Sequence, residues 1–445
     1  MKLPVVARSL ALVTAVAMIP IATAGMAQVD SRVAPEFAKL FATYQRIQAS
    51  YVDEVDDEKL IRGAIDGMLA SLDPHSAYLD GSDLERLETL IDGNYSGLGL
   101  SVVMEDGAVK VISPFRGSPA EKAGIKAGDF ITHLDGKLIY GGDLDEAVQQ
   151  MRGPAGTSIN PTIFRPGSDE PIETSVTRGV IELEPVTYEV KDGKIGVITV
   201  NEFSRDVGAD VFAAWNDIQR EAGGRVNGLV LDLRSNPGGS LDEAIALSDL
   251  FLDEGRIVSQ RGRARGESMS FNAETVYRGQ IAKDVPLIVL IDAGSASASE
   301  IVAGALQDHR RALIMGERSF GKGSVQSLVP LGPDAALKLT TARYYTPSGH
   351  SVQEGGIKPD IRVPQLSDPD MERRRKYQLR ESDLRGHLIN EADLKDDDLE
   401  NDIRQDPRFT QTAAELEEQG IEDFQLDYAL KTLRRTTPSS VALRK

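Results

Sequence analysis

The chain has 445 residues, with 69 acidic and 50 basic side chains and a formal net charge of −19. Phosphates repel an acidic chain of this kind, which excludes general nucleic-acid binding. There is no cysteine, which excludes disulfides, thiolate metal sites and cysteine nucleophiles, and none of the five histidines stands in the HExxH pattern of a helix-borne zinc protease.

Residues 1–27 have the pattern of a signal peptide for export. Lys2 and Arg8 carry positive charge, an uncharged apolar stretch follows, and the small residues of Ala22–Ala24 and Gly25–Ala27 resemble cleavage sites. The uncharged stretch is also long enough to span a bilayer, so an uncleaved membrane anchor is the alternative. In both cases we expect the rest of the chain to be exported, into the periplasm if the host has two membranes.

Residues 28–91 are predicted to form a helical N-terminal region. Apolar residues recur at helical spacing between residues 40 and 51 and again between residues 60 and 69. Asp73-Pro74 then interrupts the pattern.

Residues 92–180 are expected to form a compact unit of short strands and turns. Ser118-Pro119 is typical of a helix start, because serine caps a helix and proline suits its first position. Gly97 and Gly99 precede a strand but are not a dinucleotide fingerprint, since the third glycine and the following helix are missing. Backbone amides there could form a nest for a carboxylate, and an ordinary turn is the alternative.

Residues 181–366 alternate between buried strands and helices. Near-continuous apolar runs at 228–233 and 285–291 are each followed by a helical pattern, which indicates βαβ units and a largely parallel sheet. Ser235–Gly239 follows the first run at the carboxyl end of its strand, where ligands bind in open α/β sheets. A plain strand–helix turn there would need only one glycine.

The composition shifts again at residues 367–445, which are expected to form a solvated, charged C-terminal tail with helical pieces. Residues 373–376 are a basic run, and residues 391–406 are strongly acidic. Nothing in this part of the sequence predicts chemistry.

Two further segments are candidates for chemistry. Gly316–Gly323 nearly matches the phosphate-binding GxxxxGK[ST] loop, but Gly323 stands where a hydroxyl is required and a strand pattern follows, so we reject that interpretation. Gly294–Glu300 joins a buried strand to a helix, and a serine at a helix N-terminus suits a nucleophile, with a plain serine cap as the alternative. Since no GxSxG elbow and no obvious histidine base occur, the natural base is Lys322, whose pKa burial could lower.

Together these motifs resemble the carboxyl-terminal processing proteases, also called tail-specific proteases. The resemblance covers nearly the whole exported chain to about residue 365 and rests on segments in the family's order: Leu72–Leu79, Gly97–Leu100, Gly117–Asp129, Leu231–Gly239, Ser295–Glu300, Gly321–Gln326 and Tyr344–Gly349. It implies an α/β and α+β multidomain fold, in which a helical N-terminal arm and a PDZ domain precede a βαβ-type protease core of the crotonase/Clp-like kind and an acidic tail.

The resemblance implies a serine endopeptidase that cuts near the C-terminus of its substrates. By motif, Ser297 would be the nucleophile, Lys322 the general base, and Gln326 would orient the lysine amine. The oxyanion hole would use two backbone amides, with the choice between the two glycines left open: Ala298 and either Gly238 or Gly239. No cofactor and no metal are implied.

The PDZ domain would bind the tail of a protein substrate. The amides of Leu98, Gly99 and Leu100 would hold the terminal carboxylate of an extended peptide, and the two leucines predict substrates with apolar C-termini. Arg152, at the end of the last PDZ helix, is a candidate regulatory contact to the protease domain, with a plain surface arginine as the alternative.

The remaining expectations concern partners and a competing function. We expect a homo-oligomer, while an adaptor lipoprotein and peripheral membrane association are left open. The alternative to the enzyme is a catalytically silent, PDZ-containing scaffold that binds protein tails. The intact set of Ser297, Lys322 and Gln326 favours the enzyme, because a silent relative would be free to lose one of them.

Overall fold

The computed structural model describes residues 34–81, 83–84, 94–105, 107–114, 118–126, 128–139, 144–166, 168, 170–182, 185–273, 281, 284–368, 380–391 and 408–436. The chain divides into two compact units, residues 1–67 and 68–445, which are described separately. The predicted signal peptide and the basic run at 373–376 lie outside the described residues, and of the acidic run only Glu391 lies inside them. Within the described ranges, no helix is long and apolar enough to cross a membrane.

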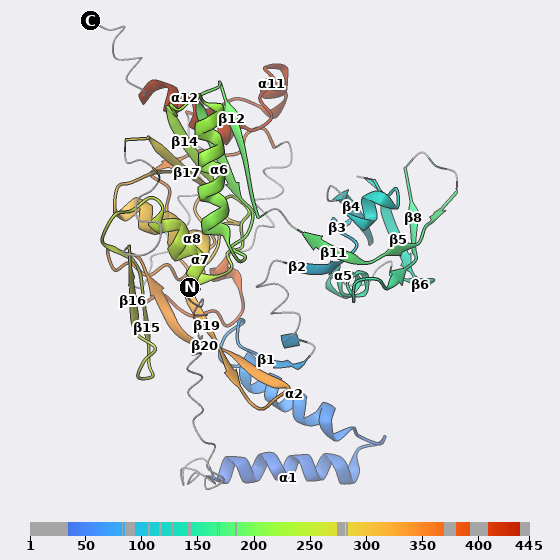
Figure 1. Cartoon of the computed structure of the whole chain (residues 1–445). Coiled ribbons are helices and arrows are strands. Elements are labelled where there is room, and N and C mark those ends of the chain that lie inside the picture. The colour runs from blue at the N-terminus through green and yellow to red at the C-terminus, as the bar shows by residue number, and fades with distance from the viewer. Residues whose placement is uncertain are drawn as a thin grey trace, which may run out of the picture. The chain divides into compact units, whose positions relative to one another are not determined.

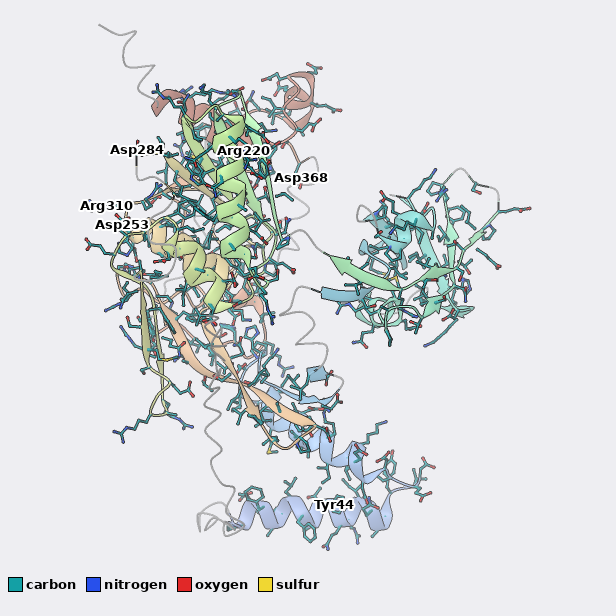
Figure 2. The ribbon with its side chains drawn as sticks, in the orientation of Figure 1. Tyr44, Arg220, Asp253, Asp284, Arg310 and Asp368 are labelled. Atoms are coloured by element: carbon teal, nitrogen blue, oxygen red, sulfur yellow. The ribbon has the colours of Figure 1, made fainter. Side chains whose placement is uncertain are left out.

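The described part of the first unit is helical, as the periodicity predicts (Figure 1). α1 spans Ala34–Ser50, and α2 spans Asp57–Ala70 and continues into the second unit. Tyr44 on α1 donates its hydroxyl hydrogen to Asp57 Oδ1 at 2.8 Å and so joins the two helices (Figure 2). Phe41 on α1 is 60% exposed, and none of the residues described between 34 and 67 is buried.

The region from β2 to β11 forms the expected unit of short strands. Its first strand, β2 (Asn94–Gly97), pairs antiparallel with its last, β11 (Gly179–Glu182), so the chain enters and leaves this region side by side. The described elements between them are β3 (Leu100–Glu105), β4 (Ala108–Pro114), α4 (Pro119–Lys122), β5 (Phe130–Leu134), β6 (Lys137–Leu138), α5 (Leu144–Met151), β7 (Ser158–Ile159), β8 (Pro161–Phe164), β9 (Ile172–Glu173) and β10 (Val176–Thr177). Ser118 caps α4 as predicted, because its hydroxyl oxygen accepts a hydrogen bond from Glu121 N at 3.1 Å.

A six-stranded sheet lies at the centre of the α/β region, in the order β12-β13-β14-β17-β18-β21. It is parallel from β13 to β21, with β12 antiparallel at the edge. The strands span Val186–Lys191, Ile195–Val200, Gly228–Asp232, Leu287–Ile291, Leu313–Gly316 and Ile361–Arg362. Every residue of β14 and of β17 is buried, which agrees with the continuous apolar runs that predicted these strands.

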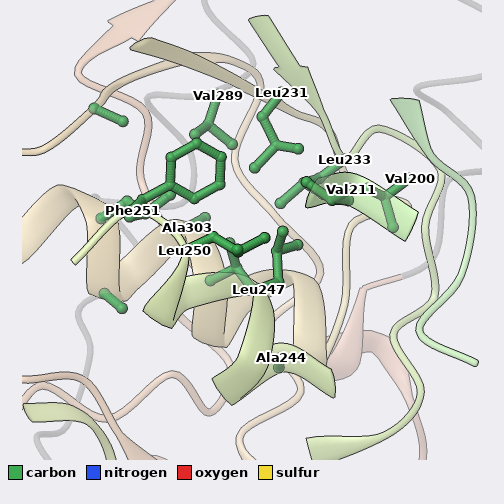
Figure 3. Packing of buried hydrophobic residues seen from close by; sticks show 14 of the residues in the cluster. Val200, Val211, Leu231, Leu233, Ala244, Leu247, Leu250, Phe251, Val289 and Ala303 are labelled. Atoms are coloured by element: carbon green, nitrogen blue, oxygen red, sulfur yellow. The ribbon is translucent and has the colours of Figure 1, made fainter. Parts of the chain in front are cut away.

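Three helices cover one face of this sheet (Figure 1). They are α6 (Val207–Glu221), α7 (Leu241–Asp249) and α8 (Ala298–Asp308). Figure 3 shows the core that they share with the strands, in which Leu247 and Phe251 lie with Leu231 and Val289. Because α7 follows β14 and α8 is the helix after β17, the loops before both helices leave the carboxyl end of the sheet.

The C-terminal helix α12 (Phe424–Thr436) covers the opposite face of the sheet. Ala429, Leu430 and Leu433 of α12 are buried against strand residues that include Val197. The expected solvated tail therefore contains a helix that completes a three-layer core. The apolar stripe of α12 is short and stands among charged residues, so composition alone concealed it. A shorter helix, α11 (Ala413–Glu418), precedes it.

A second sheet contains the two strands that follow the lysine-bearing segment, β19 and β20, and has the order β1-β20-β15-β16 with β19 beside β20. Its strands are β1 (Ala77–Asp80), β15 (Arg256–Gly262), β16 (Met269–Asn272), β19 (Ser324–Pro330) and β20 (Ala335–Tyr345). β19 begins directly after Gly323, so a strand and not a helix follows Lys322. This confirms the rejection of a phosphate-binding loop.

Candidate active site

Ser297 lies at the turn before α8 in a strained backbone conformation. Its φ and ψ are 53° and −108°, although L-residues other than glycine rarely adopt a positive φ. Ser297 and Glu300 stand in a capping-box arrangement, in which the Ser297 N–H donates to Glu300 Oε2 at 2.8 Å and the Ser297 side chain faces the Glu300 N–H without forming a side-chain cap hydrogen bond. The Glu300 N–H donates instead to Ser297 O at 2.9 Å, which argues against a plain serine cap and leaves the hydroxyl available for chemistry.

The two neighbouring serines have structural partners. Ser295 Oγ donates to Leu233 O at 2.7 Å, and Ser299 Oγ donates to Asn236 O at 3.0 Å; both serines are fully buried. These bonds join the serine turn to the loop that follows β14. Among the described residues, Ser297 is the one serine of the three whose hydroxyl forms no hydrogen bond.

The Ser235–Gly239 loop lies against the serine turn. Gly238 has a φ of +102°, and a Cβ there would meet three atoms of that turn: Ala296 O at 2.7 Å, Ser297 Cβ at 2.8 Å and Ala298 N at 3.0 Å. The structure therefore brings together the two segments predicted to form the oxyanion hole. The Gly238 N–H donates to Asn236 Oδ1 at 2.9 Å, whereas the Gly239 N–H forms no hydrogen bond within the described ranges.

The buried Glu300 carboxylate joins the serine turn to the lysine loop. Its Oε2 accepts hydrogen bonds from the N–H groups of Ser297 and Lys322, at 2.8 and 3.0 Å. Its Oε1 accepts from Ser319 Oγ at 2.6 Å and from Gly321 N at 2.7 Å. Burial raises the pKa of Glu300 to about 7, although the four hydrogen bonds act to lower it. Sequence reasoning missed this residue, whose only sequence signal was its place three residues into the helix.

Lys322 lies in an environment that favours its neutral form. Burial lowers the pKa of Lys322, and the like charge of Lys338 lowers it further. Three carboxylates act in the opposite direction without reversing the shift: those of Glu381, Glu300 and Asp73. Among the described residues, no hydrogen bond joins the Lys322 amine to the Ser297 hydroxyl, so the structure links this pair through Glu300.

Gln326 on β19 contacts a network of hydroxyl groups. Its Nε2 donates to Ser324 Oγ at 2.9 Å and to Thr340 Oγ1 at 3.3 Å, and Thr340 Oγ1 donates to Asp73 Oδ1 at 3.1 Å. The predicted contact between Gln326 and Lys322 is not among the hydrogen bonds of the described residues. Sequence reasoning missed Thr340 and Asp73, because they stand 267 positions apart.

Glu381, from the segment expected to be a solvated tail, lies beside the lysine loop. It is fully buried, and its N–H donates to Phe320 O at 3.2 Å. Its carboxylate lies 2.9 Å from His75 Nε2 and accepts a hydrogen bond from Gln353 Nε2 at 3.0 Å. Burial acts to raise the pKa of Glu381, but the hydrogen bonds from His75 and Gln353 outweigh it and lower the pKa. No sequence signal placed this residue near the site.

The predicted carboxylate loop of the PDZ region has one position that only glycine fits. Gly99 has a φ of +74°, and a Cβ there would stand 2.4 Å from Ser118 Cβ. Leu98 is buried in the core of this region, and its carbonyl accepts a hydrogen bond from Ala120 N at 2.9 Å. Leu100 is only partly buried, so of the two leucines it is the one with exposed apolar surface.

Arg152 follows α5 and lies beside the same loop. A Cβ on Gly97 would stand 3.8 Å from both Cα and Cγ of Arg152. The Arg152 N–H donates to Val148 O at 3.0 Å, so its backbone continues the last turn of α5. Its position is therefore defined within the PDZ region itself, and its predicted regulatory role remains a prediction.

Three regions of the chain match models of known families. Residues 194–363 match Peptidase family S41, residues 17–82 match the activating protease CtpB N-terminal domain, and residues 111–165 match a PDZ domain. A carboxy-terminal-processing protease of Bartonella bacilliformis is 46% identical over 402 residues, which cover 90% of this chain and 88% of that protein.

Two further relatives extend the comparison. The carboxy-terminal processing protease CtpB of Bacillus subtilis is 36% identical over 343 residues, which cover 76% of this chain and 70% of that protein. Among solved structures, the photosystem II D1 C-terminal processing protease is 30% identical with a TM-score of 0.48, and the match covers 74% of this chain and 86% of that one.

Proposed function

The chain belongs to the carboxy-terminal processing proteases of peptidase family S41, and from this premise we propose that Ser297 and Lys322 are its catalytic pair. One observation carries the proposal. The hydroxyl of Ser297 is free of a side-chain cap hydrogen bond at a strained helix start. The backbone N–H groups of Ser297 and Lys322 both donate to the same carboxylate oxygen, Glu300 Oε2. This arrangement holds a nucleophile and a partly buried amine on a common support.

In the proposed mechanism, Ser297 Oγ attacks the carbonyl carbon of the scissile peptide bond while the neutral Lys322 amine takes the hydroxyl proton. The tetrahedral intermediate collapses, and the protonated Lys322 gives its proton to the departing amine of the substrate. Lys322, now neutral, takes a proton from a water molecule that attacks the acyl carbonyl carbon. When this second tetrahedral intermediate collapses, the bond to Ser297 Oγ breaks and Lys322 returns the proton to Oγ, which restores the hydroxyl and the neutral amine. The lowered pKa of Lys322 supports this role, because only the neutral amine can accept a proton.

We assign the oxyanion hole to the N–H groups of Ala298 and Gly239. Ala298 is the first residue of α8, where a helix leaves its N–H groups without helical partners. Of the two candidate glycines, Gly238 already donates to Asn236, which favours the amide of Gly239. Gly238 would then serve by its lack of a side chain, since it lets the loop approach Ser297.

The PDZ region would select the substrates. A terminal carboxylate would bind at the amides of Leu98, Gly99 and Leu100, and the peptide would add a strand beside β3. Partly buried apolar side chains on β3 and α5 support a preference for apolar C-termini: Leu100, Val102, Leu144 and Val148.

Export to the periplasm is proposed from the signal-like residues 1–27. Fractionation of the host and sequencing of the mature N-terminus would distinguish cleavage from a membrane anchor. A homo-oligomer and a lipoprotein adaptor remain predictions.

The test is cleavage of an unfolded protein substrate, with products read by mass spectrometry. We expect internal cuts near the substrate C-terminus, and a fall in kcat of at least about 10³-fold in Ser297→Ala. Lys322→Arg should be as inactive as Lys322→Ala, because arginine cannot accept the proton at working pH. Ser295→Ala and Ser299→Ala should keep measurable activity. Full turnover by Ser297→Ala would exclude it as the nucleophile, and a silent wild-type chain would favour the scaffold function.

A further inference from the structure

One guanidinium lies between the end of β14 and the start of α12. Arg234, two residues after β14, donates from Nε to Asp232 Oδ1 at 2.9 Å. Its Nη1 and Nη2 donate to Asp423 Oδ1 and Oδ2, at 2.9 and 2.7 Å. The side chain of Arg234 is only 13% exposed, and two carboxylates hold it from two sides with forked hydrogen bonds.

Asp423 is itself fixed in place by the fold. Its Oδ1 accepts a hydrogen bond from Leu426 N at 3.0 Å, which caps the first turn of α12, and another from Gln365 Nε2 at 2.8 Å. α12 is in turn anchored by Leu430 and Leu433, which are buried against the central sheet. Asp423 is thus a rigid point of attachment and not a mobile surface carboxylate.

The loop that begins at Arg234 carries the proposed oxyanion hole. Asn236, two residues later, is fully buried, and its backbone carbonyl accepts hydrogen bonds from Ala296 N and Ser299 Oγ, both at 3.0 Å. These two donors flank Ser297 on either side. A displacement of Arg234 would therefore shift a carbonyl that holds both ends of the serine turn.

We propose that Asp423 is a positioning residue for the serine–lysine site, which acts through Arg234 to hold the Ser235–Gly239 loop in register with Ser297. The inference rests on the proposed function. It makes the C-terminal helix, which the sequence indicated to be part of a tail, a working part of the catalytic centre. Among the hydrogen bonds of the described residues, the Arg234 guanidinium is what joins Asp423 to the loop that carries the proposed oxyanion hole, while Leu426 and Gln365 hold Asp423 in place.

The expected effect lies in the transition state. The N–H donors of an oxyanion hole stabilise the transition state, in which negative charge develops on the substrate oxygen. They stabilise the ground-state complex only a little. Loss of the carboxylate charge at Asp423 should therefore lower kcat and leave KM nearly unchanged. Small misplacements of catalytic groups cost up to about a hundredfold in rate, so we expect a fall of about tenfold or more.

The variant for the test is Asp423→Asn in the full-length protein. Its amide oxygen can still cap α12 at Leu426, so the helix should stay folded, but its NH₂ group cannot accept from Arg234. Glu422→Ala, an exposed neighbour, is the matched control. Each protein is titrated for its reactive Ser297 with a phosphonylating probe, and kcat and KM are referred to the titrated sites.

A second readout follows the oxyanion hole directly. A peptide aldehyde binds as a tetrahedral adduct whose oxygen occupies the hole, whereas a product peptide does not. We expect Asp423→Asn to weaken binding of the aldehyde by the same factor by which it lowers kcat, and to leave binding of the product peptide unaffected. When it is combined with Arg234→Lys in a double variant, Asp423→Asn should add no further loss. Glu422→Ala should match the wild type in every measurement.

Three results would overturn the inference: unchanged kcat per titrated site, a KM that rises with kcat constant, or an activity loss that merely equals the loss of titratable sites. The last would make the role of Asp423 structural. If the wild-type chain shows no cleavage that depends on Ser297, the proposed function fails and this inference fails with it. Normal wild-type cleavage with an unaffected Asp423→Asn variant would refute the inference alone.

Discussion

The Glu300 carboxylate accepts four hydrogen bonds inside the protein, two at each oxygen, and three of the donors are backbone N–H groups. A backbone N–H that loses its partner in a buried site costs about 1–3 kcal/mol. The strained conformation of Ser297 also costs of order 1–3 kcal/mol, and it persists because its N–H is held at Glu300. The geometry of the proposed nucleophile therefore depends on an acid that takes no part in the proposed proton transfers.

Glu300→Gln should damage both stability and activity. One oxygen becomes an NH₂ group, so at least one buried N–H faces another donor, and we expect unfolding to become easier by about 1–3 kcal/mol. Activity of the folded fraction should fall by about tenfold or more. The serine turn loses its link to Lys322, and small misplacements of catalytic groups lower the rate by about this factor. Denaturant unfolding and kcat/KM measure the two effects. Glu254→Gln, at an exposed turn, is the control, and an equal result for both variants would contradict this role.

Lys338 should set the pH range in which the enzyme works. Its positive charge lowers the pKa of Lys322, so removal of that charge in Lys338→Gln raises the pKa. With Lys322 as the proposed base, activity would require the neutral amine and rise with pH through this pKa, so the rising limb of the kcat/KM profile should move to higher pH. The variant should lose activity near neutrality and recover it in alkali. Lys358→Gln, which alters an exposed lysine, should leave the profile in place; equal profiles for Lys338→Gln and the wild type would refute the coupling.

At the scale of elements, the sequence predicted most of what a local pattern can encode. The family and the fold class were correct, and β14 and β17 lie close to their predicted bounds because continuous apolar runs mark them locally. The local pattern marked a serine-bearing helix start, and the choice of Ser297 among its three serines came from the family resemblance. Glu381 and α12 could not, since their roles arise from contacts with residues far away in the sequence, which periodicity does not record.

The glycine loop before α7 should tolerate no side chain at its closest approach to Ser297. Gly238→Ala would place a Cβ 2.8 Å from Ser297 Cβ, so the loop or the serine turn must move apart. We expect kcat to fall about 10- to 100-fold through misplaced oxyanion donors. A glycine in another turn supplies the control. Gly223 also has a positive φ, +69°, but a Cβ at this position would have no neighbouring atom within 4 Å.

Gly223→Ala separates backbone strain from contact with the site. It should cost about 1–2 kcal/mol of stability, as a left-handed alanine does, and leave kcat unchanged. If Gly238→Ala and Gly223→Ala both lose stability while kcat stays unchanged, the close approach of Gly238 to Ser297 has no effect on catalysis. Thermal unfolding and steady-state kinetics on the same preparations decide between the two outcomes.

At the scale of the whole molecule, the order of regions in the chain would couple the proposed binding of substrate tails to cleavage. The PDZ region lies between the N-terminal helices and the protease region in sequence, and β2 pairs with β11 so that its two connections leave together. A substrate tail bound in this region remains tethered to the same molecule that cuts it. Tethering raises the effective concentration of the rest of the substrate at the active site.

The last prediction tests whether the PDZ region reads a free C-terminus. A peptide that ends in apolar residues with a free carboxylate should bind this region and compete with substrate tails or alter their cleavage, whereas its amidated form should do neither, because the amide nest loses its charged ligand.

Gly99→Ala should abolish the difference, since its Cβ would stand 2.4 Å from Ser118 Cβ. Gly124→Ala is the matched control: its φ is also positive, +82°, but the space around it is open. Calorimetric titration and cleavage rates with both peptides measure the effect, and equal binding of the two peptides to the wild type would show that the Leu98–Leu100 loop is no carboxylate site.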